Sequence, residues 1–157
     1  MAALTQTDFA GALIDLVKAF ETVPHHVLAA AACALGYPLV LLRLSIAAYR
    51  CPRTIGIDGV YSREIVATRG ITAGSGTATT ELRILLQEMM VEIGDRWSFK
   101  LTVKLYVDDL SIAGSGPRRE CIATSAMALR HAVDYFEEKL EMEVSIKKSA
   151  CLGSSSS

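Results

Sequence analysis

Residues 101–109 (LTVKLYVDD) alternate strictly between apolar and polar side chains and then end in two neighbouring carboxylates. Such alternation is typical of a β-strand with one face on a core. It places Tyr106 and Asp108 on the polar face. Adjacent strand residues point to opposite faces, so Asp109 can join Asp108 only if the chain turns there. Apolar residues at 110 and 112 then predict a return strand over 110–113, and hence a hairpin with acidic residues at its tip.

Helices and strands are expected on both sides of this hairpin. An apolar run at 9–15 indicates a buried strand, and Asp58-Gly59 predicts a hairpin turn within residues 53–70. Helices are expected at about 24–35, 38–49 and 122–140, and a last strand near 142–147. One more helix should follow Gly76, because a stripe with helical spacing is formed by Leu82, Leu85, Leu86, Met89 and Ile93. The order predicts an α+β fold, in which helices pack on one face of a mainly antiparallel sheet and the other face stays open.

Composition limits the classes of protein to which the chain can belong. At 157 residues and 51% hydrophobic content, it suits one globular domain. The formal net charge of −1 disfavours a free-standing nucleic-acid binder, which is usually basic. The four cysteines form no C-x-x-C pair, which favours idle thiols in a reducing compartment. We expect no signal peptide and no membrane segment, because the most apolar stretch, residues 27–42, is short and is interrupted by Gly36-Tyr37-Pro38.

A third carboxylate changes the interpretation of the acidic hairpin. Asp108 and Asp109 alone could be a solvated turn, since Asp is common in turns. Asp15, however, ends the most apolar strand, where an uncompensated charge is costly. Three clustered carboxylates would take up protons unless a cation neutralises them, and hard oxygen ligands suit Mg²⁺. Two such ions, about 3.5–4 Å apart, can activate a hydroxyl and stabilise a leaving phosphate.

Four segments resemble the catalytic motifs of reverse transcriptases from non-LTR retrotransposons. They occur in family order and extend over nearly all of residues 9–153. The segments are residues 15–25 (DLVKAFETVPH), 69–75 (RGITAGS), 106–109 (YVDD) and 140–149 (LEMEVSIKKS). The resemblance predicts a polymerase palm at residues 1–153, followed by a polar tail at 154–157.

The resemblance also implies roles for individual residues. Asp15 and Asp108 would hold Mg²⁺, with Mn²⁺ as the alternative, and Asp109 would assist. Phe20 matches the aromatic gate that excludes a 2′-OH; periodicity does not exclude the alternative, a Phe of the core. The remaining matched residues would lie at the substrate or act on the leaving pyrophosphate: Arg69, Gly74, Ser75, Tyr106 and Lys148, with Lys147 as the alternative to Lys148.

The activity that the resemblance implies is RNA-directed DNA synthesis, with an RNA template, a DNA primer and dNTPs as partners and no membrane. Two alternatives stay open. One is an inactive fragment or binding module that keeps the palm fold; the other is an RNA-dependent RNA polymerase or a related palm-type enzyme. Thr72-Ala73 replaces the usual Pro-Gln, and Ser145 replaces the usual Asn. Because no fingers or thumb are evident, we expect the remaining domains to belong to a longer parent protein.

Overall fold

The computed structural model describes residues 7–154. The chain forms two compact units. One combines the chain up to Val17 with the chain from Leu86 onward, and the other is Lys18–Leu85. Among the described residues, no helix is long and apolar enough to span a bilayer.

The first unit is built on a four-stranded antiparallel sheet in the order β4-β5-β1-β6. The strands are β1 (Asp8–Ile14), β4 (Leu101–Tyr106), β5 (Asp109–Gly116) and β6 (Ala150–Gly153). β1 lies between β5 and β6, with Ile14 opposite Leu110 and Ala12 opposite Cys151. Two segments that are far apart in sequence therefore meet at the same end of the sheet.

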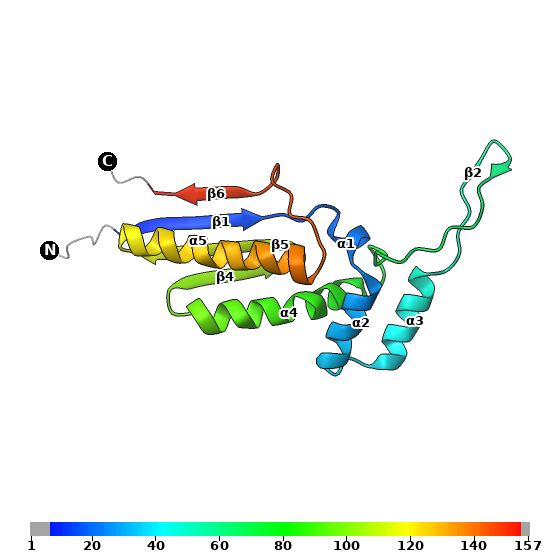
Figure 1. The fold of residues 1–157 in the computed structure, drawn as a ribbon, viewed down its shortest axis with the longest axis horizontal. Helices are drawn as coiled ribbons and strands as arrows, with labels where there is room; N and C mark the ends of the chain where they lie inside the picture. Colours follow the sequence, from blue (N-terminus) through cyan, green and yellow to red (C-terminus); the bar gives the residue numbers. More distant parts are fainter. Residues whose placement is uncertain (1–6, 155–157) are drawn as a thin grey trace. The chain divides into compact units, whose positions relative to one another are not determined.

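One face of the sheet is covered by helices, and the alternation of buried and exposed residues along β1 shows which face it is. Ala10, Ala12 and Ile14 of β1 are buried, whereas Phe9 and Leu13 are exposed. α5 (Arg118–Asp134) packs on β1 and β5, as Figure 1 shows. The predicted α+β fold, with helices on one face of an antiparallel sheet, is confirmed. The largest fully buried side chains of this unit include Phe136, Leu110, Ile112, Met89, Ile93 and Met142.

Polar contacts join α5 to the C-terminal half of α4 (Ala78–Trp97). A π-helix, η1 (Tyr135–Lys139), directly continues α5. The Tyr135 hydroxyl donates to Glu88 Oε2 at 2.9 Å, and Lys139 Nζ lies 2.8 Å from Glu88 Oε1. His131 Nε2 lies 2.9 Å from Glu92 Oε2. These contacts fix the helical layer of the first unit.

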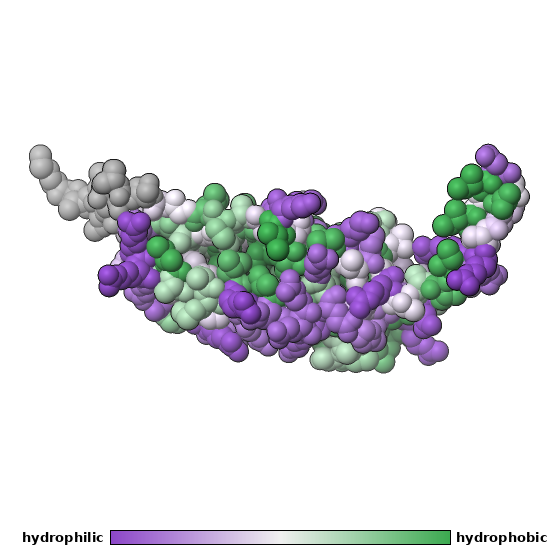
Figure 2. Space-filling model, turned by 45° about the horizontal axis from the view of Figure 1, so that its top comes forward, coloured by the Kyte–Doolittle hydropathy of each residue, from purple (hydrophilic) through white to green (hydrophobic). Residues whose placement is uncertain are grey.

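The second unit contains α1 (Ala19–Thr22), α2 (His25–Ala34), α3 (Leu39–Tyr49) and the first turns of α4. It also carries a small hairpin of β2 (Gly56–Ile57) and β3 (Val60–Tyr61), with the predicted turn at Asp58-Gly59. All residues from 50 to 66 are exposed. This segment is the arm at the right of Figure 2, where hydrophobic side chains lie on the surface.

One sequence prediction is wrong in detail. The last strand lies at Ala150–Gly153 and not near 142–147, where the only ladder contact is a bridge between Val144 and Leu16. Met142 and Val144 are buried, but Ile146 is 89% exposed, so the alternation there reflects core packing and not pairing. Ser154, the first residue of the predicted polar tail, accepts a hydrogen bond from Phe9 N at 2.7 Å. Residues 155–157 of that tail lie outside the described residues.

Candidate active site

Asp15 directly follows β1 and lies on the same open face of the sheet as Phe9 and Leu13. Its backbone is held by the segment before β6: Asp15 N donates to Ser149 Oγ at 3.2 Å, and Ser145 N donates to Asp15 O at 2.8 Å. Its side chain is 24% exposed, and Oδ1 is buried without a hydrogen-bond partner. A buried carboxylate oxygen without a donor is costly unless a cation lies nearby.

The second pair of carboxylates lies at the tip of the β4–β5 hairpin. Tyr106 pairs with Asp109, so the chain turns at Val107 and Asp108. This is the turn that the sequence predicted for the two neighbouring carboxylates. Val107 has φ 59°, a rare conformation for a β-branched residue. Because Ile14 lies opposite Leu110, this turn brings Asp109 to the end of the sheet where Asp15 lies.

A cavity of about 390 Å³ lies on the open face at this end of the sheet. Asp15, Asp109 and Tyr106 line it together with two cations, Lys104 and Lys148. Lys148 lies in the turn before β6, and its Nζ is 3.4 Å from Asp15 Oδ1. The cavity therefore combines carboxylates with ammonium groups, a composition that suits a metal-bound phosphate.

Electrostatics in this region disfavour the ionised form of Asp108. Burial raises the pKa of Asp108, and the negative charges of Asp109 and Asp15 raise it further, although Lys148 partly opposes them. The described residues include no group of three or more acidic, His or Cys side chains arranged to hold a metal. The chemistry still fits a hard divalent cation, since the neighbouring carboxylates repel one another and Asp15 Oδ1, although paired with Lys148, accepts no hydrogen bond.

Phe20 and Arg69 belong to the second unit, where backbone contacts bring their segments together. Ile71 N donates to Phe20 O at 2.8 Å, and Arg69 forms a bridge with Pro24. Gly70 has φ 94°, and a Cβ there would lie 2.9 Å from Glu21 O, so only glycine fits. The segments of the first and second motifs are thus joined at their backbones. The Phe20 side chain is half-buried.

Gly74 and Ser75 lie in the loop before α4, also in the second unit. Gly74 has φ 87°, with open space where a Cβ would project. Ser75 Oγ lies 3.1 Å from Thr77 Oγ1 and 3.5 Å from the Tyr49 hydroxyl. Behind Tyr49 lies Glu81, a fully buried carboxylate. Each unit therefore assembles its own part of the predicted site, and the roles of these residues stay predictions.

Sequence reasoning missed several residues that the structure places beside the predicted ones. Lys104 shares the polar face of its strand with Tyr106 and Asp108, so alternation alone could have included it. Glu81 lies four residues before Leu85 on the buried stripe of α4, and helical spacing could have identified it. No local pattern marks Ser149, which contacts Asp15 from 134 residues away.

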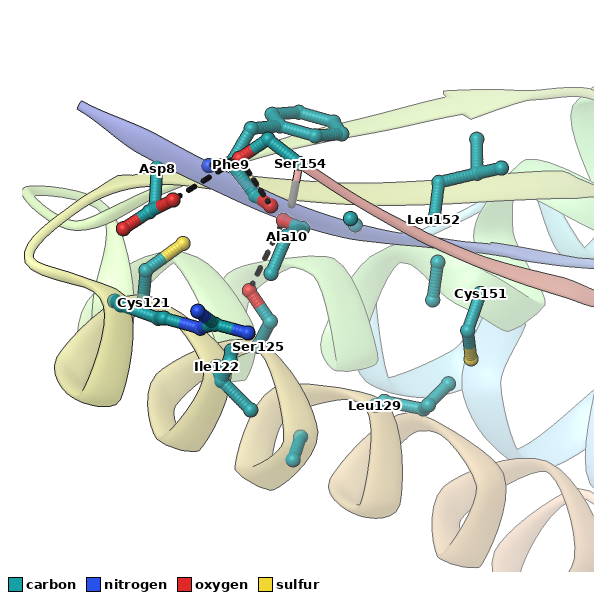
Figure 3. A pocket seen from close by; sticks show the side chains of 15 residues that line it. Asp8, Phe9, Ala10, Cys121, Ile122, Ser125, Leu129, Cys151, Leu152 and Ser154 are labelled. Carbon is teal, nitrogen blue, oxygen red and sulfur yellow. Dashed lines mark hydrogen bonds between the residues drawn. The ribbon is translucent and has the colours of Figure 1, made fainter. Parts of the chain in front are cut away.

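An apolar groove lies away from the carboxylates, on the side of the sheet that α5 covers. Figure 3 shows its wall of Ile122, Ser125 and Leu129 facing β1 and β6, with Ser125 Oγ donating to Ala10 O at 3.3 Å. Its volume is about 360 Å³. None of the predicted site residues lines it, so it is separate from the candidate active site.

Solved structures of telomerase from Candida tropicalis have a similar fold. The apo enzyme truncated from its C-terminal domain gives a TM-score of 0.73 at 9% identity, covering 96% of this chain and 31% of that chain. Telomerase in complex with a TWJ fragment of telomeric RNA gives 0.69 at 10% identity, covering 97% and 27%. This chain thus spans less than a third of their length, and the likeness concerns the fold. The fold is that of a polymerase of the reverse-transcriptase type.

The family follows from the sequence. No curated protein matches this chain. The family model described as "Reverse transcriptase (RNA-dependent DNA polymerase)" matches residues 2–156. The chain therefore belongs to the reverse transcriptase family, and the prediction of that family is confirmed. A retrotransposon origin of the non-LTR type stays a prediction.

Proposed function

We propose that this chain is the catalytic palm of an RNA-directed DNA polymerase. In the reaction, the 3′-OH of a DNA primer attacks the α-phosphate of a dNTP on an RNA template and releases pyrophosphate. One observation carries the proposal: Asp15 and Asp109 line the same cavity on the open face, with Asp108 in the adjoining turn. Family membership supports this chemistry over other uses of paired carboxylates.

Each predicted residue has a stated role in this proposal. Asp15, Asp108 and Asp109 would hold Mg²⁺ or Mn²⁺. When bound, such an ion neutralises phosphate charge and favours the ionised form of the attacking hydroxyl. Lys148 lies in the cavity, where its ammonium group would give a proton to the departing pyrophosphate. Phe20 would exclude a 2′-OH, and the substrate would contact Arg69, Gly74, Ser75 and Tyr106.

A second candidate is a palm-shaped module that is inactive without further domains. Two observations favour it. Lys148 already forms an ion pair with Asp15, and the chain spans under a third of the telomerase chains that it resembles. An RNA-dependent RNA polymerase is the third candidate. Efficient incorporation of rNTPs would support it, because Phe20 is then no barrier to the 2′-OH.

The first experiment is a magnesium titration of the wild type and of Asp108→Asn, followed by thermal unfolding. A ligand that binds the folded state at about tenfold above its Kd stabilises it by about 1.4 kcal/mol. We expect magnesium to raise the Tm of the wild type and to have little effect on Asp108→Asn. In EDTA, Asp108→Asn should be the more stable protein by up to about 1 kcal/mol, because it removes a charge that burial disfavours and that Asp109 and Asp15 repel.

Asp95→Asn is the matched control, since Asp95 is an exposed carboxylate on α4. It should respond to magnesium like the wild type. Equal responses of all three proteins would contradict the proposed metal site. Primer extension on an RNA template then separates the active palm from the inactive module: magnesium binding without extension supports the module.

A further inference from the structure

Glu81 is a carboxylate at a position that would normally be apolar. It is 0% exposed and lies on the first turns of α4, next to the buried Leu82 and Leu85. Oε2 accepts a hydrogen bond from the Tyr49 hydroxyl at 2.8 Å, whereas Oε1 is buried without a partner. A leucine would occupy such a position at lower free-energy cost, because burying a half-satisfied carboxylate is expensive. Stability alone therefore does not account for Glu81.

The hydrogen bond of Glu81 continues into the loop before α4. Tyr49 has one phenolic proton, and the carboxylate at 2.8 Å is its strongest acceptor. The Tyr49 hydroxyl also lies 3.5 Å from Ser75 Oγ, which can accept from it, and 3.5 Å from Thr77 Oγ1. Ser45 Oγ, one turn earlier on α3, lies 3.2 Å from Thr77 Oγ1. A chain of hydroxyl groups thus attaches the loop to α3, and the hydrogen bond to Glu81 holds Tyr49 within it.

The other contacts that hold this loop are local: Ser75 N donates to Thr72 O at 3.0 Å, and Thr77 N donates to Ser75 Oγ at 3.4 Å. Residues 72–74 are exposed, and no atom lies within 4 Å of the position of a Cβ on Gly74 or Gly76. Beside the loop is a cavity of about 370 Å³, which Tyr49 lines together with Arg53, Arg69 and residues 70–73. Tyr49 therefore contacts Glu81 on one side and faces this cavity on the other. Glu81 itself does not line this cavity, so a change at Glu81 would act on the loop and the cavity through Tyr49.

We propose that Glu81 is a positioning residue, which acts through Tyr49 to hold Ser75 and Thr77 in the arrangement that receives a nucleoside triphosphate. This inference rests on the proposed function, in which Gly74 and Ser75 contact the nucleotide. It adds two residues, Glu81 and Tyr49, to the second unit's part of the site. Both act on the loop by hydrogen bonding.

Two variants of the full chain test the proposal. Glu81→Leu removes the acceptor and fills the space, whereas Glu81→Gln keeps an oxygen that accepts from Tyr49. We expect Glu81→Leu to unfold at the same Tm as the wild type or a higher one. Its amides at Ser75 and Thr77 should nevertheless exchange hydrogen about tenfold faster, and its KM for dTTP should rise about tenfold with kcat little changed, since the loop loses the charge-assisted hydrogen bond that holds Tyr49. Glu81→Gln should restore both values to near those of the wild type.

Thr80→Leu is the control, because Thr80 is an exposed residue on the same turn of α4. It should leave exchange and KM unchanged. Unchanged exchange in Glu81→Leu would overturn the proposal, and so would faster exchange with an unchanged KM. If the wild type extends no primer, the proposed function fails for this chain. Hydrogen exchange still tests Glu81 in that case: faster exchange in Glu81→Leu, restored in Glu81→Gln, supports its hold on the loop.

Discussion

Val107 adopts a strained backbone conformation in the turn that carries Asp108 and Asp109. A strand residue with a branched Cβ normally avoids positive φ, and such positions cost about 1–3 kcal/mol. Val107 adopts φ 59° because Tyr106 and Asp109 pair directly across the turn. The pairing leaves Asp108 in the turn itself, beside Asp109. The strain at Val107 is therefore a consequence of the tight turn that brings Asp108 and Asp109 together.

Replacing Val107 with glycine tests this interpretation. Glycine removes the steric strain but adds about 0.5–1 kcal/mol of chain entropy and loses the half-buried side chain. We expect Val107→Gly to unfold within about 1 kcal/mol of the wild type in urea. Val103→Gly, at an unstrained position of β4, should cost about 2 kcal/mol or more because nothing offsets its losses. If the two variants are equally destabilised, Val107 is not strained.

At the scale of elements, α4 and the α5–η1 segment are joined by a cluster of charged side chains. Glu88 receives a hydrogen bond from the Tyr135 hydroxyl and pairs with Lys139, which also lies 4.6 Å from the Tyr135 ring centroid. The hydrogen bond from Lys139, followed by that from Tyr135, lowers the pKa of Glu88 below its ordinary 4.5. Burial, together with Glu88, raises the pKa of Tyr135. Both shifts mean that the contact favours ionised Glu88 and neutral Tyr135.

The pH dependence of stability should reveal this contact. A carboxyl group whose pKa is lowered by folding stabilises the protein above its unfolded pKa, and this contribution is lost as pH falls through the folded pKa. We expect Glu88→Gln to have a lower Tm than the wild type at pH 7, and the difference should shrink below about pH 4.5. Glu137→Gln, an exposed carboxylate on η1, should behave like the wild type. A constant difference between Glu88→Gln and the wild type at all pH values would show that ionisation of Glu88 is not involved.

For the whole molecule, the sequence predicts well wherever a pattern is local. Alternation at 101–107 and the helical stripe of α4 gave β4 and α4, and Asp109 was correctly expected to need a turn. β6 was misplaced because it pairs with β1, whose residues lie about 140 positions earlier in the chain. Local alternation of side chains cannot predict a pairing over that distance. The same holds for Ser149 beside Asp15 and for Tyr49 beside Glu81, since both contacts depend on tertiary structure. The four motifs indicated the family, but they did not predict a chain of two compact units.

The exposed arm allows a test on the whole chain by limited trypsin digestion. The chain has 16 Lys and Arg residues, and most of those described lie in helices or strands or beside the sheet. Arg53 and Arg63 lie in the segment 50–66, where every residue is exposed and pairing is limited to the two pairs of the β2–β3 ladder and a bridge between Arg53 and Ile65. Arg50, the third arginine of this segment, caps the end of α3. Local opening of this segment breaks few apolar contacts, so trypsin should cleave fastest after Arg53 and Arg63. Mass spectrometry should first detect fragments ending at Arg53 or Arg63, and Arg53→Gln with Arg63→Gln should slow the digestion. Earlier cuts at Lys147 or Lys148 would instead place the weakest part of the fold beside Asp15.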